Sequence, residues 1–125
     1  SKGELQQEET KIQVLEPKDI QEGQLEGVEQ LAAQSYVSEL RLLIERQKVY
    51  PVMAKKLRQQ GKILVKFKLQ KDGTVLATNL LQMSQYKILN EAAEQLVRQI
   101  SGLKPFPTEI KKMAWEFIVP IEYQM

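Results

Sequence analysis

The sequence KILVKFKLQKDGTVLATNLLQM, which runs from Lys62 to Met83, decides the fold of this chain. In its first half every second residue is apolar and lysines fill most of the positions between, which is the pattern of a strand with one buried face. The apolar residues of that face are Ile63, Val65, Phe67 and Leu69. The Asp-Gly pair at 72–73 is a turn signal and predicts a β-hairpin. The alternation blurs over 79–81, which indicates a bulge or an early end of the second strand.

The segment before the hairpin predicts two helices. Apolar residues at three- and four-residue steps predict a helix over at least 34–48, and a glycine leaves 25–33 open. Pro51 ends this helix, because the residue before a proline avoids the α region. The fixed φ of the same proline suits the start of a short second helix over 52–60, which Gly61 is expected to end.

The segment after the hairpin predicts a third helix and a last strand. Ser84 or Asn90 can cap the helix, and Ser101-Gly102 ends it. Its apolar stripe consists of Ile88, Leu89, Ala92, Ala93, Leu96, Val97 and Ile100. A proline-interrupted connector leads to WEFIVPIEYQM, residues 115–125, which alternates like a strand although Pro120 stands in its middle. Proline cannot donate to a sheet ladder, so we expect this strand at an edge.

The order helix, helix, strand, strand, helix, strand predicts an α+β fold. We expect a small three-stranded antiparallel sheet with a helix packed on one face, preceded by N-terminal helices. The last strand can lie beside either strand of the hairpin. Residues 1–24 are polar and acidic and are expected to form a flexible linker or arm. The domain is expected over 25–125, with its core from about residue 49.

The outer edge of the last strand is a candidate for binding another chain. The N–H and C=O groups of one residue point to the same side of a strand, and successive residues alternate. Because a paired ladder tolerates proline poorly, we expect the backbone groups of the even-numbered residues to face outward. These residues are Glu116, Ile118, Pro120 and Glu122.

Composition excludes several classes of protein. The 125 residues contain no cysteine and no histidine, so we expect no enzyme, no metal site and no cofactor. No apolar run is long enough to span a membrane. Residues 1–50 hold 6 Lys/Arg against 10 Asp/Glu, and residues 51–125 hold 12 against 6. The basic half carries a lysine face without interleaved aromatic residues, so we expect no nucleic-acid partner.

Several motifs stand in a fixed order over about residues 36–125. The first is YPVMAKKLRQQGKILVKFKLQKDGTV, residues 50–75, with a Tyr-Pro pair, an alanine, Leu-Arg, a glycine, the alternating strand and the Asp-Gly turn. The others are the helix with Ala92, Ala93, Val97 and Arg98, the connector Pro105-Phe106-Pro107, and the last strand with Val119-Pro120-Ile121. Together they resemble the TonB C-terminal domain family.

This resemblance implies the periplasmic domain of an energy transducer of Gram-negative bacteria. In such proteins an N-terminal span anchors the chain in the inner membrane and associates with the ExbB–ExbD proton-channel complex. The C-terminal domain binds the TonB box of TonB-dependent outer-membrane receptors by strand addition. It transmits proton-motive-force energy for the uptake of siderophores, cobalamin, haem or metals. Because this sequence starts on Ser1 without such a span, we expect a domain excised from a longer chain.

The resemblance also implies two groups of partner-binding residues. The edge strand supplies Glu116, Phe117, Ile118, Val119, Pro120, Ile121 and Glu122. Near the bound box would lie Gln47 and the pair Tyr50-Pro51. Two alternatives stay open. One is a TolA-like periplasmic interaction domain, and the other is a structural domain that forms a homodimer by exchanging its last strand.

Overall fold

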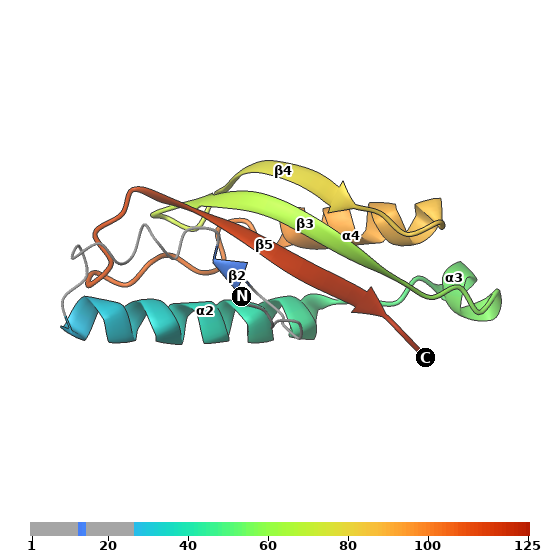
Figure 1. Ribbon diagram of the computed structural model, residues 1–125, viewed down its shortest axis with the longest axis horizontal. Coiled ribbons are helices and arrows are strands. Elements are labelled where there is room, and N and C mark those ends of the chain that lie inside the picture. The colour runs from blue at the N-terminus through green and yellow to red at the C-terminus, as the bar shows by residue number, and fades with distance from the viewer. Residues whose placement is uncertain (1–12, 15–26) are drawn as a thin grey trace, which may run out of the picture.

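The computed structural model describes residues 13–14 and 27–125 of the chain. They form an antiparallel sheet in the order β2-β5-β3-β4, and two long helices lie on one side of it (Figure 1). The elements are β2 (Gln13–Val14), α2 (Gly27–Gln47), α3 (Val52–Lys56), β3 (Gly61–Gln70), β4 (Val75–Gln82), α4 (Lys87–Gln99) and β5 (Ala114–Tyr123). The predicted hairpin is therefore β3–β4, and the predicted last strand is β5.

The expected three-stranded antiparallel sheet is confirmed in β5, β3 and β4. β3 lies in the centre, and β5 pairs with it over its whole length, from Gly61 opposite Tyr123 to Gln70 opposite Ala114. The crossover through α4 thus returns the chain to the first strand of the hairpin. The apolar residues of β3 that alternate in the sequence are buried, because this face of the sheet receives the helices.

β4 is irregular where the sequence pattern blurs. Its register with β3 skips Leu81 near one end and Leu76 near the other, so each is an extra residue in the ladder. Both leucines are exposed. The bulge expected over 79–81 is present, and a second bulge lies near the turn.

Aromatic rings fill the centre of the core between the sheet and the helices. The ring of Tyr36 lies with its centroid 5.2 Å from that of Phe106 and 6.1 Å from that of Trp115. The rings of Trp115 and Phe117 are 4.9 Å apart. All four side chains are buried, so Trp115 belongs to the core.

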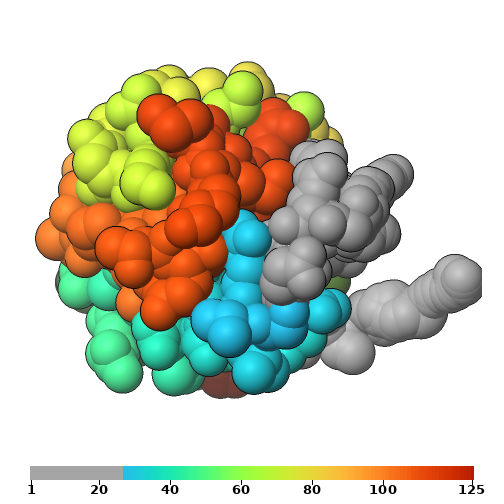
Figure 2. All heavy atoms as spheres, turned by 90° about the vertical axis from the view of Figure 1, so that its left-hand side faces the viewer, coloured from blue at the N-terminus to red at the C-terminus, as the bar shows by residue number. Residues whose placement is uncertain are grey.

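α2 is longer than its predicted minimum and docks on the sheet. It begins at Gly27, so most of the segment left open over 25–33 is helical. Its buried residues are Ala33, Tyr36, Leu40 and Ile44. The Tyr36 hydroxyl donates to the Lys104 carbonyl at 2.7 Å, and the Lys111 N–H donates to Glu29 Oε2 at 2.9 Å. These bonds hold the first half of α2 against the connector between α4 and β5 (Figure 2).

α3 ends earlier than the sequence predicts. The helix expected over 52–60 stops at Lys56, and Arg58 adopts a positive φ of 56°. The Gln59 N–H then donates back to the Ala54 carbonyl at 2.8 Å, which satisfies an orphan carbonyl of the helix end. Gly61 was expected to end this helix, but it begins β3 instead.

The capping role expected of Ser84 or Asn90 is wrong. The N-cap residue of α4 is Tyr86, which makes no side-chain capping bond. Asn90 Oδ1 instead accepts hydrogen bonds from the N–H and the hydroxyl of Ser84, both at 2.8 Å. The Tyr86 N–H donates to Ser84 Oγ at 3.1 Å. These bonds fix the loop between β4 and α4.

The position of Gly61 leads to a prediction about stability. A Cβ atom at Gly61 would stand 2.6 Å from the Cβ of Ser84, so the backbone would have to shift. We expect Gly61→Ala to lower the free energy of unfolding by about 1–3 kcal/mol, measured by urea denaturation. Gly27→Ala is the matched control, because a Cβ there meets no atom within 4 Å. Equal effects of the two substitutions would contradict the role of the Ser84 contact.

The arm expected over 1–24 lies outside the described residues except for Gln13 and Val14. These two residues form β2 on the outer side of β5 and add a short fourth strand to the sheet. In the part of the chain that the structure describes, no helix combines the length and apolar character needed to cross a bilayer.

Candidate functional site

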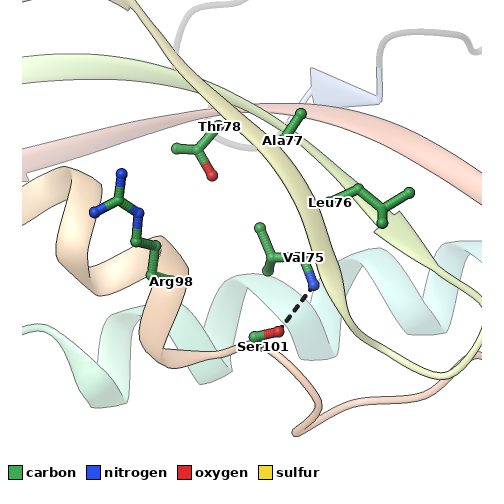
Figure 3. Close-up of a pocket in the computed structure, with 6 residues that line it drawn as sticks. All are labelled: Val75, Leu76, Ala77, Thr78, Arg98 and Ser101. Atoms are coloured by element: carbon green, nitrogen blue, oxygen red, sulfur yellow. Dashed lines mark hydrogen bonds between the residues drawn. The ribbon is translucent and has the colours of Figure 1, made fainter.

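The edge at β4 is a poor template for an added strand. Its two bulges break the regular spacing of backbone groups. The N–H of Val75 at its start already donates to Ser101 Oγ at 2.9 Å. This bond borders a shallow hollow of about 330 Å³ beside β4, which Thr78 and Arg98 also line (Figure 3). Because the Arg98 guanidinium is paired with Glu94 at 2.7 Å, the hollow is not built around a free cation.

β5 lies at the other side of the sheet, where among the described residues only the two-residue strand β2 lies beyond it. It is the more regular strand, with ten residues and no register shift against β3. Three of its predicted site residues are buried in the core: Phe117, Val119 and Ile121. The other four are half-buried or exposed on the face of the sheet opposite the helices: Glu116, Ile118, Pro120 and Glu122. A partner at this edge would thus meet backbone groups and the side chains of the second set, because the first set is committed to the core.

The direction of the backbone groups in β5 follows from a bond next to its start. The Lys71 N–H donates to the Met113 carbonyl at 2.9 Å, which continues the β3–β5 register by one pair. Hydrogen-bonded and non-hydrogen-bonded pairs alternate in an antiparallel ladder, so the odd-numbered residues of β5 bond to β3. Leu64 and Pro120 then form a non-hydrogen-bonded pair, and the Pro120 nitrogen faces away from β3. The missing donor therefore costs this ladder no bond.

The carbonyl of Glu122 indicates the same direction independently. It accepts a hydrogen bond at 2.6 Å from Nζ of Lys48, which follows α2. The same ammonium lies 3.5 Å from Glu45 Oε1 and 5.6 Å from the centre of the Tyr123 ring. No signal in the sequence singles out Lys48, because a lysine just after a helix usually belongs to a solvated surface.

The predicted Tyr-Pro region lies beside the C-terminal end of β5. The Tyr50 ring packs edge-on against Tyr123, with centroids 5.4 Å apart, and its hydroxyl donates to the Gln59 carbonyl. Pro51 is the N-cap residue of α3 rather than its first helical residue. Gln47 ends α2 with an exposed side chain. The structure thus gives Tyr50 a packing role and leaves Gln47 accessible.

Because Tyr123 is buried, the stability of the domain is expected to fall at alkaline pH. Burial raises the pKa of Tyr123 to about 12, because the phenolate would be poorly solvated there. In the unfolded chain the pKa is about 10, so this contribution to stability is complete below pH 10 and is lost as the pH rises toward 12. We expect the free energy of unfolding, followed by circular dichroism in urea, to fall over this range. Burial also raises the pKa of Tyr36, so Tyr123→Phe should reduce the fall without abolishing it. An identical fall in both chains would contradict the role of Tyr123.

The face of the sheet opposite the helices carries charged side chains. Lys66 Nζ lies 3.7 Å from Glu116 Oε2, so a lysine of β3 meets a carboxylate of β5. Such a half-exposed pair adds little stability. Within residues 13–14 and 27–125, no three His, Cys, Asp or Glu side chains gather in a way that could hold a metal ion.

Comparison with known proteins gives consistent matches. The family described as Gram-negative bacterial TonB protein C-terminal matches residues 46–125. Protein TonB of Campylobacter coli is 29% identical over 90 residues, which cover 72% of this chain and 37% of that protein. This chain therefore spans little more than a third of that relative.

Two solution structures of the Helicobacter pylori TonB C-terminal domain have a similar fold, each at 26% identity. The first has a TM-score of 0.62 and covers 73% of this chain and 81% of its own. The second has a TM-score of 0.57, with coverages of 71% and 92%. The similarity thus extends over most of the described residues.

Proposed function

The chain belongs to the family of Gram-negative bacterial TonB C-terminal domains, and we propose that it is the periplasmic receptor-binding domain of a TonB-type energy transducer. In this proposal the outer edge of β5 accepts the TonB box of an outer-membrane receptor as an added strand. An N-terminal span in the inner membrane, in contact with ExbB–ExbD, would deliver the energy of the proton-motive force. The outcome would be uptake of a siderophore, cobalamin, haem or a metal.

The observation that carries this proposal is the regular outer edge of β5 with Pro120 in its middle. Strand addition needs a row of backbone donors and acceptors, and the backbone of β5 faces outward at every second residue, with a carbonyl alone at Pro120. An open edge also risks unwanted pairing, which proline and charge reduce. Pro120 and the carboxylates of Glu116 and Glu122 place both safeguards on this strand.

The expected affinity is modest. Each ladder bond contributes about 0.5–1.5 kcal/mol net. Four to six such bonds contribute about 2–9 kcal/mol in total, and the ordering of the peptide offsets part of it. The dissociation constant is therefore expected to be micromolar, at about −8 kcal/mol, or weaker. A contact of this strength can form and break repeatedly during transport.

A nuclear magnetic resonance titration tests the proposal. The ¹⁵N-labelled chain is mixed with peptides that carry the N-terminal segments of TonB-dependent receptors, and scrambled peptides serve as controls. We expect the largest amide shifts at Glu116, Ile118 and Glu122. Shifts confined to the edge around Val75 and Thr78 would contradict strand addition at β5.

Self-association at the same edge is the second candidate function, because β5 could pair with β5 of another copy. Sedimentation over a range of protein concentrations measures this. A dimer that persists at saturating receptor peptide would favour the structural role. A monomer at all concentrations would exclude it.

A further inference from the structure

The outer edge of β5 already pairs with another segment of the same chain. Gln13 lies opposite Ile118, and Val14 lies opposite Phe117. The backbone groups of Ile118 face outward, so Gln13–Ile118 is the pair that exchanges hydrogen bonds. Val14–Phe117 is then a non-hydrogen-bonded pair, and the N–H of Val14 faces away from β5.

The far end of the edge is engaged as well. Lys48 Nζ donates a hydrogen bond to the outward-facing carbonyl oxygen of Glu122, at 2.6 Å. Between Ile118 and Glu122 stands Pro120, which offers a carbonyl and no donor. The protein's own groups therefore occupy backbone positions of β5 that an added strand would need.

We propose that the segment containing Gln13 and Val14 is an intramolecular competitor for the partner strand at the edge of β5. The proposal rests on the proposed function, since the competing partner is a receptor strand. A receptor strand that pairs with Ile118 must first displace Gln13. The segment thereby covers the edge while no receptor is present, and it lowers the apparent affinity for any extended peptide.

The size of the effect follows from the size of the contact. One hydrogen-bonded pair supplies two ladder bonds, so the covered state is only modestly favoured. The apparent dissociation constant equals the intrinsic one divided by the fraction of molecules with an open edge. We expect loss of the competitor to tighten peptide binding by about three- to tenfold.

Two proline substitutions in the full chain separate this contact from general effects on the segment. In Gln13→Pro the ring stands where the N–H points at the Ile118 carbonyl, so the pair cannot form. In Val14→Pro, the matched control, the ring points away from β5 and the pair remains. Hydrogen exchange of the Ile118 amide should be faster in Gln13→Pro, and it should be equal in Val14→Pro and the unmodified chain.

The competition itself is measured with a peptide of residues 9–16, ETKIQVLE, added to each ¹⁵N-labelled chain. It should shift the Ile118 amide and bind Gln13→Pro about three- to tenfold more tightly than the unmodified chain or Val14→Pro. The proposal would be overturned if the Ile118 amide exchanged at the same rate in the unmodified chain, Gln13→Pro and Val14→Pro, or if the peptide bound all three with the same affinity.

Receptor peptides provide the distinguishing arm of the experiment. If they shift the amide signals of β5 and bind Gln13→Pro and the unmodified chain with equal affinity, the competitor is refuted and the proposed function stands. If ETKIQVLE binds as expected but no receptor peptide does, the intramolecular pairing stands and the proposed function fails.

Discussion

A chain carrying Ile118→Pro is expected to keep its fold and to lose most of its affinity for a receptor strand. The backbone groups of Ile118 face away from β3, so the substitution removes no bond of the β3–β5 ladder. It removes an outward donor next to the gap at Pro120 and places a ring against the incoming strand. We expect affinity to fall by at least about tenfold, measured by the amide titration.

Two neighbouring substitutions serve as controls for this result. Ile118→Val keeps the N–H and should bind like the unmodified chain. Val119→Pro removes a donor that bonds to β3 at a buried position, so this chain is expected to unfold. Full binding by Ile118→Pro would rule out addition at this edge, and unfolding of Ile118→Pro would mean that its backbone faces β3.

Phe117→Ala is expected to destabilise the core of the domain strongly. The side chain is fully buried, with its ring 5.7 Å from Phe67, 4.9 Å from Trp115 and 6.3 Å from Tyr36. Truncation loses this burial and leaves a cavity between the sheet and α2. We expect the free energy of unfolding to fall by about 3–5 kcal/mol, a large part of the stability of a small domain.

Phe117→Leu is the matched control, since it keeps most of the apolar volume and should cost about 1 kcal/mol. Urea denaturation of both chains measures the difference. A loss below about 1 kcal/mol for Phe117→Ala would show that the core collapses around the site. Together with Ile118→Pro, this pair separates the residue that holds β5 in place from the neighbour that would meet a partner.

Much of the fold could be predicted because its elements carry strong local patterns. The alternation in β3 and the stripe of α4 each follow one period, and Pro120 predicted β5 at an edge, where the structure adds only the short strand β2 outside it. The same proline predicted which backbone groups face outward, and the bonds at Met113 and Glu122 agree with that direction. These are properties of single strands and helices, which the order of residues specifies directly.

The errors lie where contacts between distant residues decide the structure. The end of α3 depends on Arg58 in a left-handed conformation, which is uncommon for a residue other than glycine. Gly61 is required by its approach to Ser84, and Lys48 meets a carbonyl 74 residues away in the sequence. Neither the spacing of apolar residues nor secondary-structure propensity predicts such pairs, because each depends on how separate elements pack.

The full-length pairing of β5 with β3 has a mechanical consequence. A pull along a strand bound to the outer edge of β5 would run parallel to the ladder from Gly61–Tyr123 to Gln70–Ala114. The hydrogen bonds of the bound strand to β5, and those of β5 to β3, would then be loaded in shear. Bonds loaded in this way share the force and have to break together. A pull across the sheet would instead open them one after another, as in unzipping. A tether that is weak at equilibrium can therefore withstand tension along β5 and still release when it is peeled from one end.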